Sequence, residues 1–369
     1  MTHSEYMKKA LELAKKGMGF VSPNPMVGAV IVKDGEIIGQ GFHRKYGELH
    51  AERNAFADCR ARGNSAEGAD LYVTLEPCCH YGKTPPCTEA VIENKIKRVF
   101  IGSSDPNPLV AGKGAEILKN NGIEVYEGVL KDECDELNEV FFHYITLKKP
   151  FVIMKYAMTI DGKIACFNGS SRWVTGESAR LNVQKDRKRY SAIMVGVNTV
   201  ISDNPMLTCR IENGVNPIRI ICDTNLRTPI DCNITDTAKE VPAIIATCCN
   251  DTEKQAEYIK KGCKIIVTEK KDNHVNLNQL VDELGKLKID SVILEGGGEL
   301  NWSAIKSGIV DKVQAYIAPK IFGGANAKTA VSGTGFDSPD KACILYDSHI
   351  RQIGDDFLIE SRVKKCSQE

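Results

Sequence analysis

Four residues of the sequence could together hold a metal ion and move protons. His50 and Glu52 lie two positions apart, and Cys78 and Cys87 frame a loop that follows an apolar run at residues 71–75. Catalytic zinc is held by three protein ligands, with a fourth position open to water. Cys87 opens a run with helical spacing, where a helix N-terminus favours a thiolate. We therefore expect the two cysteines and His50 to bind zinc, with Glu52 beside the metal.

Such a zinc site would carry out hydrolysis. Bound zinc lowers the pKa of water from about 15.7 to about 7, which makes hydroxide available at neutral pH. Glu52 would take a proton from that water and pass it to a leaving amine. The order His-x-Glu…Pro-Cys…Cys is the signature of the zinc nucleobase deaminases. Two alternatives remain: three unrelated buried residues, or a closed structural site with Cys79 or His80 as fourth ligand, which leaves Glu52 unexplained.

Length, charge and cysteine content restrict the class of protein. The 369 residues suggest two domains, and the hydrophobic content of 42% suits a globular chain. Lys+Arg and Asp+Glu are 48 each, so the formal net charge of zero argues against broad electrostatic binding of nucleic acid. No apolar run approaches the roughly 18 residues of a membrane span. Fourteen cysteines, with no signal-peptide core at the N-terminus, indicate a reducing compartment, and we expect a cytoplasmic protein.

The hydrophobic pattern predicts two α/β units. In the first, Asp34-Gly35 joins strand-like runs as a hairpin, and a single amphipathic helix is expected over residues 134–145. Pro150 ends that helical region, so we place the domains at 1–147 and 148–369. In the second half, strand-like runs alternate with helical ones, which indicates a mostly parallel sheet. The runs expected as strands there are 151–156, 192–195, 218–222, 243–247, 264–267, 291–294, 313–319, 343–346 and 357–363.

The spacing of the two cysteines narrows the family. Eight residues separate Cys78 from Cys87, whereas two are common in zinc deaminases. The run Pro-Cys-x-His-x-Gly-x-Thr-Pro-Pro-Cys ending at Cys87, with the Pro-Asn-Pro runs after Ser22 and Asp105, resembles the bifunctional riboflavin-biosynthesis deaminase/reductase family (RibD). The resemblance implies a cytidine-deaminase-like three-layer domain followed by a dihydrofolate-reductase-like α/β reductase domain.

The resemblance also assigns residues of the deaminase half. In that family the metal ligands are the histidine and the outer two cysteines, which makes Cys79 a bystander. Five further residues would surround the substrate: Asn24, His43, Lys83, Asp105 and Asn107. Asparagine amides can read a pyrimidine edge, and a lysine can pair with a phosphate. By residue type alone, each of the five would be a turn, cap or surface residue.

A glycine-rich turn at residues 295–299 follows a strand and opens a helix, where backbone N–H groups can approach a phosphate. It is not the Gly-x-Gly-x-x-Gly fingerprint, and by itself it is not specific. The motifs that begin at Lys155, Ser171 and Thr199 resemble the family's reductase domain, which implies NADPH as cofactor. By that resemblance the cofactor contacts are Met158, Trp173, Thr199, Asp203, Thr224, Gly297, Gly298, Glu299, Leu300, Asn301, Trp302 and Ser303. The ribosyl-phosphate substrate would contact Ser171, Arg187, Leu207, Arg210 and Glu295.

Residue type leaves other interpretations open for some of these positions. Trp173 could be a core residue, Arg187 could lie on a solvated helix face, and Met158 could contact the cofactor through its backbone only. The rival functions are an RNA-editing adenosine deaminase and a non-catalytic zinc-stapled scaffold. Zero net charge and the long loop between the cysteines count against the first, and Glu52 counts against the second.

Together, residues and resemblance predict a bifunctional enzyme of riboflavin biosynthesis. Its first domain would use zinc to deaminate a diaminohydroxyphosphoribosylaminopyrimidine by hydrolysis. Its second would use NADPH to reduce the ribosyl group to a ribityl side chain. The expected partner is this small molecule, with neither nucleic acid nor membrane, and the resemblance implies a homo-oligomer, either a dimer or a tetramer.

Overall fold

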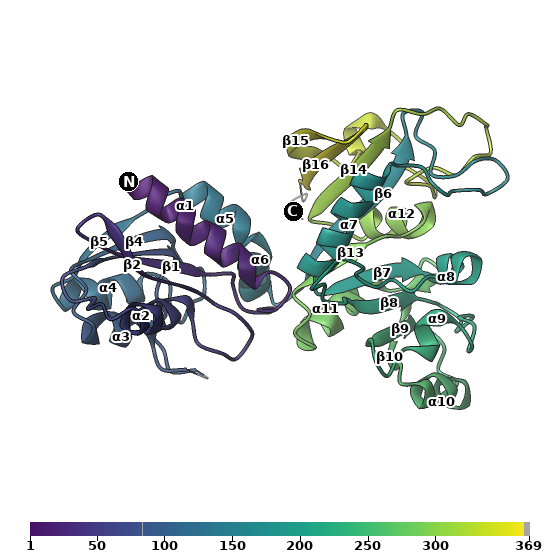
Figure 1. Ribbon diagram of the computed structural model, residues 1–369. Helices are drawn as coiled ribbons and strands as arrows, with labels where there is room; N and C mark the ends of the chain where they lie inside the picture. Colours follow the sequence, from purple (N-terminus) through teal and green to yellow (C-terminus); the bar gives the residue numbers. More distant parts are fainter. Residues whose placement is uncertain (83, 365–369) are drawn as a thin grey trace. The chain divides into compact units, whose positions relative to one another are not determined.

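The computed structural model describes residues 1–82 and 84–364. The chain divides into two compact units, Met1–Lys148 and Lys149–Glu369 (Figure 1). This division falls one residue after the one expected from the sequence. The mixed α/β architecture of both units agrees with the predicted fold class.

The first unit is built on a five-stranded sheet with the strand order β2-β1-β3-β4-β5. Its strands are β1 (Gly28–Lys33), β2 (Glu36–Phe42), β3 (Asp70–Leu75), β4 (Arg98–Ser103) and β5 (Glu124–Glu127). β1 runs antiparallel to β2 and β3, whereas β3, β4 and β5 are parallel. The carboxyl ends of β3 and β4 therefore lie side by side, and the segments that follow them begin at neighbouring points.

Helices cover both faces of this sheet (Figure 1). They are α1 (His3–Ala14), the 3₁₀ turn η1 (Lys15–Gly17), α2 (Ala51–Ala61), α3 (Cys87–Glu93), α4 (Lys113–Asn120), α5 (Lys131–Leu137) and α6 (Glu139–Leu147). Successive strand side chains point to opposite faces. Ala29 and Ile31 accordingly pack in the core with α2, α3 and α4, whereas Val30 and Val32 pack with α1 and α5. This is the three-layer arrangement that the resemblance implied.

The single amphipathic helix expected over residues 134–145 is wrong. The structure breaks it into α5 and α6 at Asn138, whose backbone leaves the helical region with φ −107° and ψ 18°. The buried Asn138 side chain accepts a hydrogen bond from the Met26 N–H at 2.9 Å and donates one to its carbonyl at 3.0 Å. A tertiary contact across 112 positions therefore decides a boundary that local periodicity does not reveal.

The second unit contains a nine-stranded sheet in the order β10-β9-β8-β7-β13-β6-β14-β16-β15. Its strands are β6 (Phe151–Thr159), β7 (Ala192–Gly196), β8 (Ile218–Cys222), β9 (Ala243–Thr247), β10 (Lys264–Val267), β13 (Ser291–Leu294), β14 (Lys312–Ala318), β15 (Leu345–Ile353) and β16 (Asp356–Val363). The strands from β10 to β14 in this order are parallel, and β16 and β15 add an antiparallel edge. The mostly parallel sheet was expected, but β15 is longer than the run at 343–346.

The helices of this unit are α7 (Glu177–Arg189), α8 (Val197–Asp203), α9 (Asn233–Asp236), α10 (Thr252–Lys261), α11 (Leu277–Lys286) and α12 (Gly298–Lys306), with the 3₁₀ turn η2 (Pro339–Lys341). A small hairpin of β11 (Lys270–Lys271) and β12 (His274–Val275) precedes α11. α11 buries Leu280 and Leu284 against the sheet, and α7 packs Ala179 and Val183 against Tyr316 and its neighbours. Three adjacent parallel strands, β8, β7 and β13, each end in a loop or helix start at the same edge.

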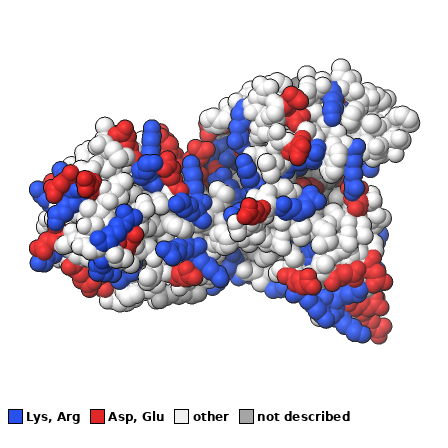
Figure 2. Space-filling model, in the orientation of Figure 1, with Lys and Arg blue, Asp and Glu red and all other residues white. Residues whose placement is uncertain are grey.

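No helix within residues 1–82 and 84–364 combines the length and apolar character needed to cross a membrane. On the face drawn in Figure 2, basic and acidic side chains are interspersed, in keeping with their equal totals of 48.

Candidate active sites

The three expected metal ligands come together in the first unit. The Cys78 sulfur lies 3.4 Å and the Cys87 sulfur 3.5 Å from Nδ1 of His50, and the three donor atoms lie within 4.8 Å of one another. His50 is the N-cap of α2, Cys78 follows β3, and Cys87 opens α3. Two sulfurs and one imidazole nitrogen are a donor set that zinc prefers.

The electrostatics of this cluster suit a cation. A hydrogen bond from Cys87 is the largest influence on Cys78 and, with His50, lowers the pKa of the Cys78 thiol to about 4. The same hydrogen bond to Cys78 raises the pKa of Cys87, and burial raises it further. One sulfur is therefore a thiolate at neutral pH, which is the form that binds metal. The fit between the residues and a zinc ion is good in both chemistry and charge.

The closed structural site is not supported. Among the residues that the structure describes, the cluster contains only the two cysteines and the histidine. The Cys79 sulfur instead donates toward the Leu109 carbonyl at 3.6 Å. Arg53 fastens the loop between the ligands, because its Nε and Nη2 donate to the carbonyls of Pro85 and Pro86 at 3.2 and 2.8 Å. Arg53 was not predicted, although its place next to Glu52 on α2 was a usable signal.

Glu52 lies in the first turn of α2, and only 3% of its surface is exposed. Burial is the largest influence and raises the pKa of its carboxyl group, and the neighbouring Cys78 raises it further. A carboxyl group with a raised pKa exchanges protons near neutral pH more readily than an exposed one. The position and the environment of Glu52 both suit proton transfer beside a metal.

Asn24 and His43, two of the predicted substrate residues, contact each other. Asn24 Nδ2 donates to Nε2 of His43 at 3.2 Å, and Nδ1 of His43 donates to the Leu49 carbonyl at 3.1 Å. A carbonyl can only accept, so this contact assigns the ring proton to Nδ1. Burial lowers the pKa of His43, which keeps the ring neutral. The His43 ring lies 5.3 Å from the His50 ring, edge to face, and so borders the metal cluster.

Asp105 and Asn107 lie together on the loop after β4. The Asn107 N–H donates to Oδ1 of Asp105 at 2.8 Å, and burial raises the pKa of Asp105 to about 6. This loop is held by Glu76, whose buried carboxylate accepts hydrogen bonds from the N–H groups of Asp105, Gly112 and Ala115 at 3.3, 3.0 and 3.2 Å. Lys83 lies outside the described residues.

Glu76 is a functional candidate that the sequence reasoning passed over. It directly precedes Pro77 and Cys78, so one short segment carries both a metal ligand and the anchor of the Asp105 loop. The only sequence signal was a carboxylate directly after the strand-like run at residues 71–75, two positions before a metal ligand.

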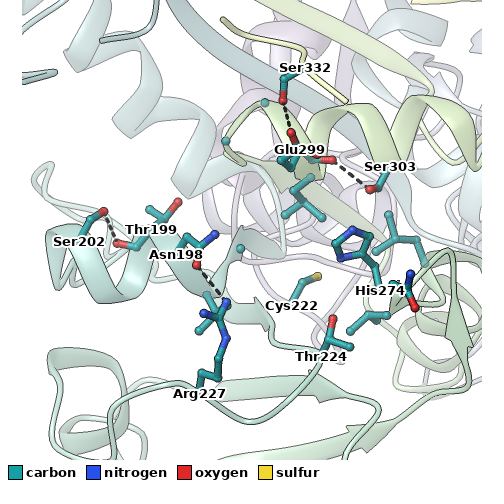
Figure 3. Close-up of a pocket in the computed structure, with 18 of the residues that line it drawn as sticks. Asn198, Thr199, Ser202, Cys222, Thr224, Arg227, His274, Glu299, Ser303 and Ser332 are labelled. Carbon is teal, nitrogen blue, oxygen red and sulfur yellow. Dashed lines mark hydrogen bonds between the residues drawn. The ribbon is translucent and has the colours of Figure 1, made fainter. Parts of the chain in front are cut away.

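The second unit contains a cavity of about 720 Å³ at the carboxyl ends of β8, β7 and β13 (Figure 3). Ligands commonly bind at such an edge in parallel α/β sheets. Seven of the twelve predicted cofactor residues line it: Thr199, Thr224, Gly297, Gly298, Glu299, Leu300 and Ser303. Asn198, Cys222, Arg227 and His274 also line it, although the sequence did not single them out.

The other five predicted cofactor residues lie outside this cavity. Met158 lies in β6, and Asp203 is exposed at the end of α8. Asn301 is fully buried and donates to the Ala330 carbonyl at 2.8 Å, so it supports the cavity wall from behind. Trp302 lines a smaller neighbouring pocket. Trp173 is 58% exposed beneath the Arg180 guanidinium, 4.6 Å from its ring centroid, so it is not a core residue.

Arg187 and Glu295, two of the predicted substrate residues, form a buried ion pair. Nε and Nη2 of Arg187 donate to the two carboxylate oxygens of Glu295 at 3.2 and 3.0 Å. Lys155 Nζ lies 3.7 Å from the same carboxylate, and the three side chains are 12–14% exposed. Two cations against one anion leave the cluster with one positive charge. Arg187 is therefore not on a solvated helix face, and Lys155 joins the candidate residues.

The remaining predicted substrate residues lie on two loops. Nη1 of Arg187 donates to the carbonyl of Thr208 at 3.2 Å, which brings the segment containing Leu207 and Arg210 to the cluster. Leu207 is buried, whereas Arg210 is exposed. Ser171 lies on the exposed loop that follows β6.

Two family descriptions match the chain. "RibD C-terminal domain" matches residues 150–359, and "Cytidine and deoxycytidylate deaminase zinc-binding region" matches residues 1–103. The first region contains the cavity and the ion-pair cluster, and the second contains all three residues of the metal cluster.

Relatives match along nearly their whole length. A riboflavin biosynthesis protein RibD of Actinobacillus pleuropneumoniae is 53% identical over 98% of this chain and 95% of its own. The RibD protein of Escherichia coli is 36% identical over 97% and 99%. The solved structure of a diaminohydroxyphosphoribosylaminopyrimidine deaminase/5-amino-6-(5-phosphoribosylamino)uracil reductase from Thermotoga maritima is 40% identical, with a TM-score of 0.89 over 98% of this chain and 99% of that one.

Proposed function

The chain belongs to the RibD family of riboflavin-biosynthesis proteins, and from that membership we propose how its residues divide the work of two reactions. The protein is a bifunctional enzyme with deaminase and then reductase activity, and it uses zinc and NADPH. We assign residues 1–147 to the deaminase domain and 148–369 to the reductase domain. The family matches at residues 1–103 and 150–359 support this division.

In the deaminase domain, His50, Cys78 and Cys87 would hold the zinc ion. When bound, zinc supplies Lewis-acid chemistry that makes a water nucleophilic at neutral pH. The Glu52 carboxylate takes the proton of the attacking water and returns it to the amine nitrogen, so that ammonia can leave. Its burial beside Cys78 supports this role, because the carboxyl can hold that proton between the two steps.

The other deaminase residues position the substrate. The Asn24 amide offers its oxygen and its second N–H to the pyrimidine edge, and its contact with the neutral His43 fixes its orientation. Asp105 and Asn107 present a second polar edge that Glu76 holds in place. We keep Lys83 as the phosphate contact, a role that follows from resemblance and residue type.

In the reductase domain, we propose that the cavity at the ends of β8, β7 and β13 holds NADPH. The nicotinamide supplies the hydride when bound. The first turn of α12 presents backbone N–H groups at Gly297 and Gly298 to the pyrophosphate. The Lys155, Arg187 and Glu295 cluster faces the ribosyl-phosphate substrate, and its net positive charge suits a phosphate-bearing molecule.

The observation that carries the deaminase assignment is the cluster of His50, Cys78 and Cys87 with the buried Glu52 beside it. Two variants, one in each domain, test the two activities separately. With the diaminopyrimidine substrate, Glu52→Gln should lower deamination by about 10²- to 10⁴-fold while zinc content stays the same. Mass spectrometry of the products, with zinc measured by elemental analysis, gives both readouts. Glu93→Gln, an exposed carboxylate on α3, is the control. Unchanged deamination in Glu52→Gln would remove Glu52 from the mechanism.

The matching variant for the reductase is Gly297→Tyr. Gly297 has φ −75° and ψ 172°, and a Cβ there would meet no atom within 4 Å, so a side chain adds no backbone strain. Because Gly297 lines the cavity, the tyrosine would occupy cofactor space. We expect this variant to lose NADPH binding in calorimetry and to keep full deamination. Unaltered NADPH binding would overturn the cavity assignment.

We further propose that the enzyme is a cytoplasmic homo-oligomer. All thirteen cysteines in the described part of the chain are free thiols, as expected in a reducing compartment. Strand β15 lies at the edge of the large sheet, and its first eight residues are exposed, including Leu345 and Ile350. An exposed apolar edge strand is suited to pairing with a second copy. Light scattering should give a multiple of the chain mass that Ile350→Lys reduces; a monomeric wild type would refute the proposal.

A further inference from the structure

The cavity of the reductase domain has two polar ends, and they differ in charge. At one end is the glycine turn that opens α12, and beside it lies the Glu299 carboxylate, which accepts a hydrogen bond from Ser332 at 2.9 Å (Figure 3). At the other end, on the loop after β8, is Arg227, the one arginine among the described residues that line the cavity.

The geometry points to Arg227, with Asn198, as the pair that recognises the 2′-phosphate of NADPH and so distinguishes it from NADH. This inference rests on the proposal that the cavity is the cofactor site. NADPH differs from NADH by a single phosphate on the adenosine ribose. A guanidinium is the group best suited to bind a phosphate, because it offers paired N–H donors in a fixed plane.

Arg227 is available for a ligand. Its Nη2 donates to Oδ1 of Asn198 at 3.0 Å, and no carboxylate pairs with it in the described part of the chain. Both side chains are exposed, and they meet at the cavity wall, where the arginine reaches from the β8 loop to the start of α8 (Figure 3). The hydrogen bond to Asn198 orients the guanidinium without neutralising its charge.

The loop that carries Arg227 is held in place by its own contacts. The buried Asp223 accepts hydrogen bonds from the N–H and the hydroxyl of Thr228 at 2.6 and 2.7 Å. Leu226 is buried with a positive φ of 51°, and its N–H donates to the Asp223 carbonyl. The Thr224 carbonyl accepts from the N–H of Cys248. Little loop entropy is therefore lost when a ligand meets Arg227.

Charge and distance decide which phosphate goes to which end. The N–H groups at the start of α12 favour the pyrophosphate. A further dianion there would be repelled by Glu299, whereas the Arg227 end has no such carboxylate among the lining residues. β8 is two strands away from β13, a separation of about 10 Å at ordinary strand spacing, which one nucleotide can span. The adenosine ribose and its 2′-phosphate therefore fall at the β8 loop.

The test is a comparison of dissociation constants for NADPH and NADH by calorimetry on the full chain. For Arg227→Ala we expect NADPH binding to weaken by about 10- to 100-fold and NADH binding to stay within about twofold. Arg227→Lys should recover part of the preference, because it keeps the charge and loses the planar fork. Equal changes for both coenzymes, or no change for either, would overturn the inference.

Lys328, which lines the same cavity, provides the matched control. Lys328→Ala should leave the ratio of the two dissociation constants as in the wild type; a ratio that falls in this variant and not in Arg227→Ala would overturn the inference. Gly297→Tyr tests whether the cavity binds the coenzyme at all, separately from the role of Arg227. If it blocks both coenzymes and Arg227→Ala leaves the ratio unchanged, only the inference fails. If it leaves both dissociation constants unchanged, the cavity assignment fails as well.

Discussion

Replacing Glu295 by glutamine removes the only negative charge from the cluster it forms with two cations. Its carboxylate accepts two hydrogen bonds from Arg187 and lies 3.7 Å from Lys155, and the three side chains are 12–14% exposed. The substitution leaves two positive charges facing each other with little access to water. Removing one partner of a buried ion pair costs about 3–5 kcal/mol of folding free energy. We expect about 3 kcal/mol at pH 7, because the amide oxygen of glutamine still accepts from Arg187.

The pKa of Glu295 in the wild type gives a second estimate of the stability difference, and it predicts how that difference depends on pH. Burial alone would raise the pKa of Glu295, but Arg187 and Lys155 outweigh it and hold the pKa at about 2, below its ordinary 4.5. Because the folded pKa is the lower one, the stabilisation is complete above about pH 4.5 and is lost as the pH falls toward 2. A shift of about 2.5 units corresponds to about 3 kcal/mol. About 1 kcal/mol of it is lost by pH 4 and about 2 kcal/mol by pH 3.

Tryptophan fluorescence can follow this unit within the full chain, because both tryptophans, Trp173 and Trp302, belong to it. Urea titrations at several pH values should show the difference between wild type and Glu295→Gln shrink from about 3 kcal/mol at pH 7 to about 1 kcal/mol at pH 3. The control is Asp272→Asn, whose pair with Lys306 is solvent-exposed and should contribute little to stability at any pH. If Glu295→Gln unfolds at the same urea concentration as the wild type at pH 7, the reasoning is refuted. It is also refuted if the difference in stability between the two proteins does not change with pH.

Three further predictions test single polar contacts. Glu76→Gln turns an acceptor of three N–H groups into a partial donor, and we expect deamination to fall by about 10- to 100-fold with zinc content unchanged; equal rates would show that the loop does not need this anchor. Burial raises the pKa of Asp186 from 3.8 to about 6, so ionisation of this carboxyl opposes folding increasingly as the pH rises from about 4 to 6. Asp186→Asn should therefore gain about 2 kcal/mol relative to wild type between pH 4 and 8, and a constant difference in urea titrations would contradict this. Asn138→Ala leaves the Met26 N–H and carbonyl without partners and should destabilise the first unit by about 2 kcal/mol, measured by circular dichroism; an unchanged melting curve would show that water replaces the contact.

The elements that the sequence predicted well are those whose burial pattern is local. The Asp34-Gly35 hairpin and the alternating runs of the parallel sheet carry their own signals. α8 was not expected, because its seven residues include three valines or isoleucines and resemble a continuation of β7. β15 was expected to be shorter, since a strand exposed on both faces shows no apolar alternation. Sequence periodicity reveals an element only when one of its faces is buried and the other exposed. Elements that lack this pattern, such as α8 and β15, are therefore missed or misjudged in length.

The candidate site residues divide along a similar line. The residue types of the zinc cluster were enough to identify its chemistry from the sequence, and the fold brings the three donor atoms together. Arg187 and Glu295 are 108 positions apart, and nothing in the sequence pairs them. Glu76, Lys155 and Arg227 act through partners that are distant in the sequence, and no local motif indicates such contacts.

The direction of the parallel strands explains why candidate residues were easier to predict than their contact partners in both units. Cys78 follows β3, Asp105 follows β4, Thr224 follows β8 and Glu295 follows β13. Each lies one to three residues beyond a parallel strand, where the chain leaves the sheet and its side chains become free for ligands. A sequence marks such strand ends clearly, so the residues can be selected. The order of strands in the sheet decides which ends are neighbours, and that order depends on packing across the whole unit. Candidate residues at these strand ends could therefore be proposed from the chain and its family resemblance, whereas Glu76, Lys155, Arg227 and the pairing of one strand end with another required the fold.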